Sequence, residues 1–343
     1  MSKLELFDPH IASEEQLRAV HDLYVETHLE RLPDDPPQPF AEIVEEWKHQ
    51  PSFRQVTRWA VWDGLVALGS SVVSVEHLDQ NKDQAWFWAH VRKPHRRGGL
   101  GTRLLAPALE LAHKEDRPRL ATWTWDGSDG EGFISWLGGD RRLSDRTSRA
   151  WVKDVDADLM RMWVERAPER ASDYELVSWE GPVSDDLLQA YIDVLDVMNT
   201  APREDFEEED WHWTPEQLRD WENAAIERGL TWWVMSARHQ PTGELVGVTN
   251  IFFPPHRPYR ADQGDTGVDP EHRNKGLGRW LKAAMFLKLI EEKPEVDRID
   301  TDNADSNEPM LAINTEMGFR PLITSAVWQV PLEKAEAALA GRG

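Results

Sequence analysis

The stretch His272-Arg273-Asn274-Lys275-Gly276-Leu277-Gly278 lies between an extended run that ends at Val268 and a predicted helix that begins near Gly276. Its two glycines allow backbone conformations, and a close approach of other groups, that a Cβ atom would obstruct. The following helix directs its unpaired first-turn amides and the positive end of its dipole at the same point. The stretch therefore predicts a loop that binds an anion through main-chain N–H groups.

The same pattern occurs a second time in the chain, at Pro94-His95-Arg96-Arg97-Gly98-Gly99-Leu100-Gly101. This copy also follows a strand-like run and precedes a predicted helix. Its Arg96 is separated from Arg273 by 177 positions. A repeat on this scale indicates a duplicated domain if other landmarks keep the same spacing.

Two further landmarks do keep that spacing. Trp151 and Trp328, which end two similar segments, are again 177 positions apart. The turn signal Asp63-Gly64 has a counterpart in Thr242-Gly243, with an offset of 179. We predict two copies of one domain, an N-terminal copy over residues 1–166 and a C-terminal copy over residues 167–343.

Composition agrees with two globular domains. The chain has 343 residues, of which 40% are hydrophobic and 29% are charged, as is typical of soluble proteins. No apolar run approaches the roughly 18 residues of a membrane span, and the start of the sequence lacks the apolar core of a signal peptide. We expect a cytoplasmic monomer or homodimer that does not bind a membrane.

Charge and cysteine content exclude several functions. The 39 basic and 62 acidic residues give a net charge of −23, which disfavours nucleic acid as a partner and mildly favours a cationic one. The absence of cysteine excludes disulfides, thiolate catalysis and cysteine metal sites. The sequence has no serine-hydrolase elbow, no zinc-protease histidine pair and no P-loop, and we expect no metal.

Each copy is predicted to run as a strand, two helices, an antiparallel meander, the anion loop, and then helix, strand, helix and strand. This order predicts an α/β domain with a mixed, mostly antiparallel twisted sheet flanked by helices. Among the expected elements are a helix over Ser184–Met198 and a short last strand of the first copy through Arg149–Val152.

Two motifs of the second copy resemble those of the GNAT superfamily of acyl-CoA N-acyltransferases. The run from Val268 to Gly278 is similar to the family's pyrophosphate loop, and the run from Asn307 to Phe319 is similar to its second motif. The whole chain resembles the tandem-domain members, the group that includes mycothiol synthase. The resemblance implies two tandem GNAT domains and transfer of acetyl from acetyl-CoA, as co-substrate, to a primary amine of a small molecule by direct attack.

The resemblance also implies which residues bind CoA. Loop amides would hold the diphosphate, with side-chain charge added by Arg273 and Lys275. A bulge would separate the strand before the loop from the strand after it, so that the pantetheine arm pairs with backbone whose N–H polarises the thioester carbonyl. Asn307 would contact that arm. The other implied CoA-binding residues are Thr266, Gly267, Val268, Asn274, Gly276, Leu277, Gly278 and Arg279.

The catalytic residues are less well defined. Asn314 occupies the position of the family's tyrosine general acid and cannot donate a proton as a phenol can. The thiolate would leave unassisted, since a thiol has a pKa of about 8.5, or another group would serve. Candidates for proton transfer are Asp265 and Asp262 on the strand before the loop and His256 in the preceding turn. A surface or turn role is the alternative for each.

The first copy departs further from the family pattern. Gly127, Gly130 and Ile134 stand at the positions that match Asn307, Met310 and Asn314. We predict a degenerate domain that performs no chemistry and shapes the acceptor site or the interface. Its possible CoA site comprises Val91, Arg96, Arg97, Gly98, Gly99, Leu100 and Gly101.

Two other functions remain open at this stage. A non-catalytic tandem domain would bind acyl-CoA as a sensor or scaffold, and the missing tyrosine favours it. A transferase that uses aminoacyl-tRNA on the same duplicated fold would need a basic channel, which the net charge of −23 disfavours. The acidic run over 203–213 is either a solvated surface loop or a rim that attracts an ammonium group, with Trp211 and Trp213 supplying cation–π contact.

Overall fold

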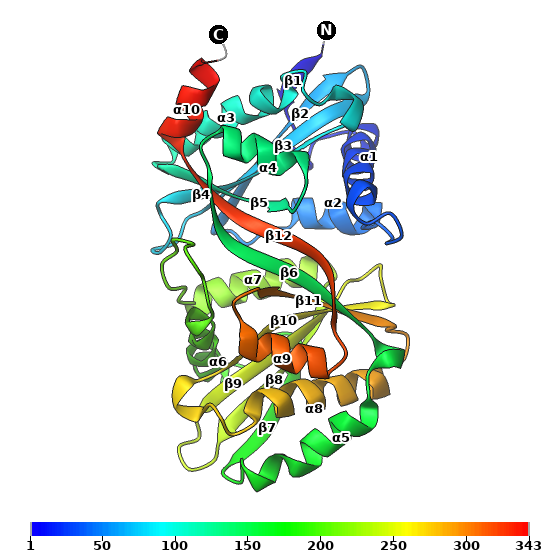
Figure 1. Cartoon of the computed structure of the whole chain (residues 1–343), viewed down its shortest axis with the longest axis vertical. Helices are drawn as coiled ribbons and strands as arrows, with labels where there is room; N and C mark the ends of the chain where they lie inside the picture. Colours follow the sequence, from blue (N-terminus) through cyan, green and yellow to red (C-terminus); the bar gives the residue numbers. More distant parts are fainter. Residues whose placement is uncertain (1, 342–343) are drawn as a thin grey trace. The chain divides into compact units, whose positions relative to one another are not determined.

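The structure is a computed structural model that describes residues 2–341. The chain forms two compact units, each of which contains a β-sheet with helices on both faces (Figure 1). Unit 1 consists of Met1–Arg142 and Ala326–Gly343, and unit 2 consists of Leu143–Ser325. Among the described helices, none is long and apolar enough to cross a membrane.

The sheet of unit 1 has the strand order β1-β2-β3-β4-β5-β12. One face packs against α1 and α2, and the other packs against α3, α4 and α10 (Figure 1). The bounds are β1 (Lys3–Leu6), α1 (Glu14–Arg31), α2 (Phe40–Lys48), β2 (Arg54–Asp63), β3 (Val66–Glu76), β4 (Gln84–Val91), η1 (Lys93–His95), α3 (Leu100–Lys114), β5 (Arg119–Trp125), α4 (Asp129–Trp136), β12 (Arg320–Pro331) and α10 (Leu332–Ala340).

The sheet of unit 2 has the strand order β6-β11-β10-β9-β8-β7. Helices α5 and α8 pack on one face, and α6 and α7 pack on the other. The bounds are β6 (Asp140–Trp151), η2 (Val152–Asp154), α5 (Ala157–Arg166), η3 (Ala167–Glu169), β7 (Tyr174–Glu180), α6 (Leu188–Leu195), η4 (Asp196–Thr200), α7 (Pro215–Glu227), β8 (Thr231–His239), β9 (Leu245–Phe253), β10 (Arg260–Val268), η5 (Pro270–His272), α8 (Leu277–Glu292), β11 (Arg298–Ala304) and α9 (Glu308–Glu316).

Both predicted hairpin turns are present. Gly64 has a φ of 60° between β2 and β3, and Gly243 has a φ of 78° between β8 and β9. Positive φ is readily adopted by glycine, which explains the two turn signals in the sequence. The predicted fold class, an α/β fold with a mixed, mostly antiparallel sheet, is confirmed.

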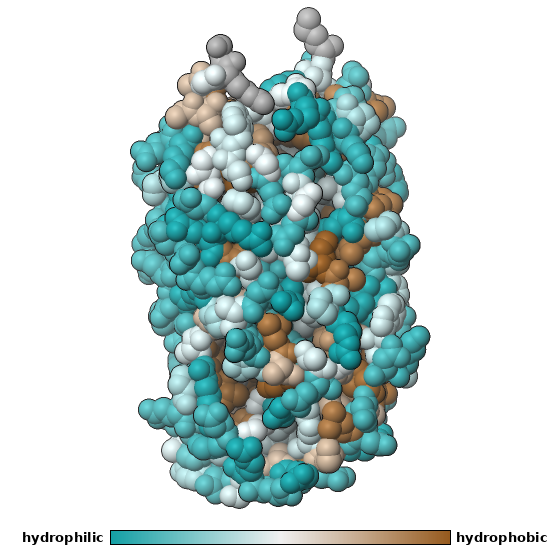
Figure 2. Space-filling view, in the orientation of Figure 1, coloured by the Kyte–Doolittle hydropathy of each residue, from teal (hydrophilic) through white to brown (hydrophobic). Residues whose placement is uncertain are grey.

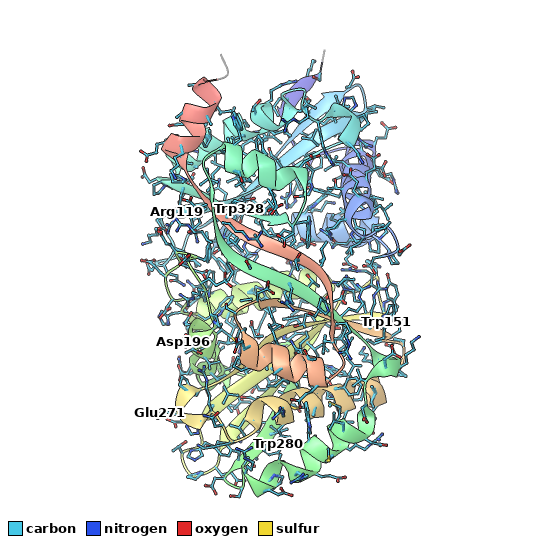
Figure 3. The ribbon with its side chains drawn as sticks, in the orientation of Figure 1. Arg119, Trp151, Asp196, Glu271, Trp280 and Trp328 are labelled. Atoms are coloured by element: carbon cyan, nitrogen blue, oxygen red, sulfur yellow. The ribbon has the colours of Figure 1, made fainter. Side chains whose placement is uncertain are left out.

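The compact units do not coincide with the predicted boundary between residues 166 and 167. Each repeat contributes its last strand to the sheet of the other unit. In unit 2, β6 pairs with β11, and a buried ion pair joins Arg149 to Asp300 at 2.6 Å. In unit 1, the Trp328 indole on β12 donates to the Thr124 hydroxyl at 2.7 Å; Figure 3 labels Trp328 on this strand.

Sequence periodicity cannot predict this exchange, because it shows that a strand exists and not which sheet the strand joins. The exchange also explains why β6 is longer than predicted. It extends over Asp140–Trp151, whereas only Arg149–Val152 was expected.

The surface in Figure 2 is mostly hydrophilic, with scattered hydrophobic patches, as the high content of charged residues requires.

Candidate active site

The anion loop of unit 2 contains two left-handed residues. Asn274 has a φ of 64° and Gly276 has a φ of 83°, and α8 begins at the next residue, Leu277. Asparagine and glycine are the residues that best tolerate this conformation. A backbone that alternates in this way brings successive N–H groups to one concave side, which binds anions.

The N–H groups of this loop are available to a ligand. From Asn274 to Arg279, no amide donates to an acceptor within residues 2–341, and the first bond of the helix runs from Trp280 N to Gly276 O at 3.0 Å. The positive end of the α8 dipole lies at the same place. Main chain alone therefore provides a binding site for a diphosphate.

Two basic side chains flank the loop. The Arg273 guanidinium donates to the Val268 carbonyl at 2.9 Å and to the Thr200 hydroxyl. The Lys275 ammonium donates to the Tyr174 hydroxyl at 2.7 Å. Neither cation forms an ion pair with a carboxylate in the described part of the chain, so both charges remain available to a phosphate. The Arg279 side chain, in contrast, pairs with Glu316 at 2.5 Å, and only its amide faces the loop.

The two strands beside the loop separate in the middle of the sheet. Parallel pairing of β10 with β11 extends from Arg260↔Arg298 to Gln263↔Thr301 and then stops, while β10 continues to Val268. The Thr301 hydroxyl donates to the Gln263 carbonyl at 3.2 Å at the point of separation. Beyond it, β10 pairs only with β9. Within residues 2–341 no strand pairs with its other edge over the predicted Thr266–Val268, which leaves this edge open to an extended ligand apart from the Val268 carbonyl that Arg273 binds.

A β-bulge lies where the strands separate. Between Gln263 and Thr266, two residues of β10, Gly264 and Asp265, stand opposite Asn250 of β9. A Cβ atom on Gly264 would lie 2.2 Å from Asn250 Oδ1 and 2.6 Å from an edge carbon of Phe252. Glycine is therefore required at this position. The bulge turns the side chain of Asp265 toward the face that carries Asn250.

Asp265 is the candidate base that the structure places at the bulge. The residue as a whole is exposed, whereas protein atoms surround its carboxyl group, which accepts a hydrogen bond from the Asn250 side-chain amide at 3.3 Å. The surrounding protein raises the pKa of this carboxyl by desolvation, although the hydrogen bond from Asn250 lowers it. A carboxylate with a raised pKa is a stronger base than one in water.

Tyr191 of α6 was not among the predicted site residues. Burial raises the pKa of its phenol, and the charge of Asp265 raises it further. The phenol therefore stays protonated beside the carboxylate. The sequence carries only four tyrosines. The position of Tyr191 within a predicted apolar helix is the sequence feature that could have identified it.

Asn314 and Asn307 both lie on α9. The Asn314 side chain is buried and donates to the Asn303 side chain at 2.7 Å, while its own carbonyl oxygen has no partner in the described residues. Asn307 is the N-cap of α9 and accepts from the Met310 amide at 3.4 Å. Neither side chain can act as a general acid.

The structure does not bring His256 to the site. This exposed residue precedes the start of β10 at Arg260, whereas the open edge begins after Gln263. Thr266 lies six positions along the strand from Arg260, which corresponds to roughly 20 Å. We therefore assign His256 no part in proton transfer.

The face of the unit 2 sheet that carries Asp265 is acidic overall, although Arg149, Arg260 and Arg298 lie on it as well. Register places Asp262 of β10, Asp302 of β11 and Asp145 of β6 on the same face. Burial, reinforced by the charge of Asp302, raises the pKa of Asp145 to about 6. The pKa of Asp302 is also raised, again mainly by burial. Such a face attracts a cation.

The acidic loop over 203–213 borders this face. The Glu204 carboxylate accepts from the Ser144 amide of β6 at 3.0 Å. The same loop is fixed to η4, because the Trp211 amide donates to the Asn199 side chain at 2.8 Å. Of the two interpretations of this loop, the contact with β6 favours a rim beside the acidic face.

The anion loop of unit 1 has the same backbone but a different charge. Arg97 has a φ of 62° and Gly99 a φ of 83°, which match the values of the second loop. The Arg96 guanidinium, however, is paired with Glu30 at 2.8 Å and with Asp129 at 3.1 Å. Two carboxylates thus neutralise the cation that corresponds to Arg273.

Unit 1 also lacks the bulge. Its β4 pairs with β3 without a shift in register from Trp86 to Val91. When β4 and β10 are aligned at their last residues, Val91 and Val268, the single residue Trp88 stands where unit 2 has the two residues Gly264 and Asp265. In the same register, Trp86 replaces Asp262 and Trp123 replaces Asp302. The acidic face of unit 2 is therefore aromatic in unit 1.

Sequence comparison identifies one family. Residues 195–319 match the family model described as acetyltransferase (GNAT) family. These residues contain the open edge, the anion loop and α9. No curated protein sequence matches the chain significantly.

Solved structures share the fold of the whole chain. A tandem GNAT protein from the clavulanic acid biosynthesis pathway superimposes with a TM-score of 0.79 at 23% identity, over 97% of this chain and 99% of that one. A GCN5-related N-acetyltransferase from Sphaerobacter thermophilus gives a TM-score of 0.68 at 13% identity, over 96% of each chain. The chain therefore shares the fold of both proteins over nearly its whole length.

Proposed function

We propose that this chain, which carries an acetyltransferase domain of the GNAT family over residues 195–319, transfers acetyl from acetyl-CoA to a primary amine of a small molecule. The bulge of β10 supports the proposal, because Asp265, whose carboxyl has a raised pKa, precedes the open strand edge on the strand that leads to the anion loop. Each of these three parts supplies one requirement of the reaction.

The anion loop would bind the CoA diphosphate. The amides from Asn274 to Arg279 would donate to its oxygens, and Arg273 would add a charge-assisted hydrogen bond. The open edge of β10 over Thr266–Val268 would pair with the pantetheine arm as an added strand. An N–H group of this edge would polarise the thioester carbonyl where negative charge develops.

Asp265 would accept the proton of the incoming amine. An alkylammonium has a pKa of about 10 in water and must lose a proton before it can attack. The amine nitrogen then attacks the thioester carbon, the C–S bond breaks, and the second proton of the nitrogen passes to the departing thiolate, which gives the amide and CoA. Tyr191 would hold a hydrogen bond as a protonated phenol, because its pKa is raised. Asn314 leaves the departing thiolate without a tyrosine donor.

The acidic face favours a cationic acceptor. Asp145, Asp262, Asp265 and Asp302 lie on it, and only part of their charge is offset, for example where Arg260 pairs with Asp262 at 2.6 Å. An ammonium group would be concentrated there before it loses its proton. The same charges would repel the phosphates of a tRNA, which disfavours the aminoacyl-tRNA alternative.

The remaining alternative is a domain that binds acyl-CoA without catalysis. It predicts the same affinity for acetyl-CoA and no release of thiol when amines are added. Thiol release is therefore measured with 5,5′-dithiobis(2-nitrobenzoate) across a panel of primary amines, with wild type and Asp265→Asn. We expect amine-dependent release by wild type and its loss in the variant. Release at the same trace rate with and without amines would favour the sensor.

A further inference from the structure

A cavity of about 500 Å³ lies in unit 1, between the sheet and the helices α1 and α2. Alternate residues of β2, β3 and β4 form its floor, so that a single face of the sheet lines it. Tyr24 of α1 and Trp47 of α2 lie on the opposite side. The volume falls within the range of about 300 to 1,000 Å³ that small-molecule sites occupy.

A buried cation stands on the floor of this cavity. Arg58 is 8% exposed, and its Nε atom has no hydrogen-bond partner in residues 2–341. Burial lowers the pKa of its guanidinium, although the charges of Tyr24, Glu46 and Asp8 act in the opposite direction. A buried guanidinium without a paired anion destabilises a fold. A bound anion would remove that cost.

The other arginine on the same strand is already paired. Arg54 donates to the Glu76 carboxylate at 2.8 Å across the β2–β3 pair. Two residues further along β2, Val56 is opposite Ser74, and the next residue on this face is Arg58. The cavity thus has one satisfied cation at one end and one unsatisfied cation at the other.

The walls next to Arg58 are flat and aromatic. Register places Val72 between Arg58 and Trp88, in one row across the three strands. The Trp86 and Trp88 rings lie 5.7 Å apart and only 10° from parallel. Such a pair presents a planar surface on which an aromatic ring can stack.

The second repeat does not have this cavity chemistry. Val234 of β8, opposite Asn250, holds the register position of Arg58. It is completely buried in the apolar core that α6 and α7 form with the sheet. The fold alone therefore requires neither a cation nor an aromatic pair at these positions, and their presence in unit 1 needs another explanation.

We propose that unit 1 binds a small aromatic monocarboxylate in this cavity, with the carboxylate paired to Arg58 and the ring against Trp88. Glu46 and Glu76 also line the cavity, and they would repel a phosphate dianion more than a single carboxylate. Arg58 would repel an amine. The site uses none of the residues proposed for acetyl transfer.

Isothermal titration of the full chain with indole-3-acetate tests the proposal. We expect saturable binding of one molecule per chain. Indole-3-acetamide, tryptamine and inorganic phosphate should each bind at least about 10-fold more weakly, since a single charge-assisted pair is worth that factor. Equal binding of the amide, or stronger binding of tryptamine, would overturn the proposal, as would no binding of any aromatic carboxylate in a wider panel.

Two variants assign the site. Arg58→Met should abolish binding while raising the melting temperature of the unliganded protein, because it removes an unpaired buried charge. Arg54→Lys is the matched control, and it should leave affinity within about threefold, because lysine keeps a positive charge beside Glu76. If Arg58→Met fails to fold, Trp88→Phe should still fold and weaken binding several-fold. Unchanged affinity in these Arg58 and Trp88 variants would contradict the proposed site.

Discussion

The carboxylate of Asp265 accepts a hydrogen bond from the side-chain amide of Asn250 at 3.3 Å, across the bulge of β10. At Gly264, within the bulge, a Cβ atom would lie 2.2 Å from Oδ1 of the same asparagine. The pair of neighbouring strands β9 and β10 thus determines both the position of Asp265, the proposed base, and the pKa of its carboxyl. Unit 1, which has Trp88 at this place, has neither the bulge nor the base.

Replacement of Asp265 by asparagine should lower kcat/KM for the amine by about 10²- to 10⁴-fold, the usual contribution of a general base. Wild-type activity should fall as pH decreases through the raised pKa of Asp265, because the protonated acid cannot accept a proton. Steady-state kinetics from pH 4 to 9 would measure this limb, and the variant should lack it. An acidic limb that persists unchanged in the variant would assign it to another group.

The same substitution should also stabilise the protein. A carboxyl whose pKa is raised by folding contributes stability below its unfolded pKa and loses it as pH rises through the folded pKa. At pH 7 the ionised Asp265 is therefore a net cost, which asparagine removes. Thermal unfolding of Asp265→Asn at pH 7 should give a higher melting temperature than wild type. A lower one would show that the carboxylate is held for structural reasons.

Gly264→Ala should distinguish the role of the bulge in catalysis from the role of the anion loop in CoA binding. The added methyl would collide with Asn250 and Phe252, and overpacking of this kind costs about 1 to 3 kcal/mol. We expect a large loss of kcat with CoA affinity within about threefold, measured by kinetics and calorimetry. Gly132→Ala is the control, because nothing lies within 4 Å of a Cβ there. Full activity of Gly264→Ala would contradict the role of the bulge.

Much of this arrangement was predictable from sequence. The paired glycine loops and turn signals gave the duplication, and the fold class followed from the order of elements. The predicted helix over Ser184–Met198 proved shorter, since α6 ends at Leu195 and η4 follows. Tertiary contact explains the change: a Cβ on Gly267 would lie 2.7 Å from Val197 Cγ1, so η4 packs closely on β10.

The exchange of last strands and the bulge were beyond sequence reasoning. A strand's partner depends on contacts such as Arg149 with Asp300, which lie 151 positions apart in the chain. The bulge adds a single residue and leaves the hydrophobic pattern unchanged. Neutralisation of Arg96 by Glu30 and Asp129 likewise depends on distant residues, so the two anion loops looked equivalent in sequence.

Lys282 provides a test of stability against pH. It is 1% exposed on α8, with its ammonium 5.4 Å from the Phe319 ring, and burial lowers its pKa to about 7. Leu105 holds the matching position in the first repeat. A depressed lysine pKa makes the free energy of unfolding rise with pH between about 7 and 10, by up to about 1.4 kcal/mol per unit.

The variant Lys282→Leu should therefore be more stable than wild type at pH 6 and should show a flatter dependence on pH. Urea unfolding at pH 6, 7, 8 and 9 would measure both effects. If the free energy of unfolding changes by the same amount per pH unit in the two proteins, the lysine remains charged in the fold. Lys288→Leu is a useful control. Burial is the largest single effect on the pKa of Lys288 and lowers it, but Glu292 and Glu180 together raise this pKa above its ordinary value.

Asp145 should affect acceptor binding more than chemistry. With a pKa raised to about 6, it is ionised above that pH and attracts an ammonium. Asp145→Asn should raise KM for a cationic amine several-fold at pH 8 with little change in kcat. The effect should shrink at pH 5, where the wild-type carboxyl is protonated, and should be absent for a neutral acceptor. A fall in kcat alone would contradict an electrostatic role.

The most direct test of the central claim, that acetyl-CoA binds at the anion loop of unit 2 alone, is calorimetric titration of the full chain with acetyl-CoA. We predict one site per chain, about 10- to 100-fold weaker binding in Arg273→Met, and unchanged binding in Arg96→Met. A stoichiometry of two, no detectable binding, or loss of affinity in Arg96→Met rather than Arg273→Met would contradict the account.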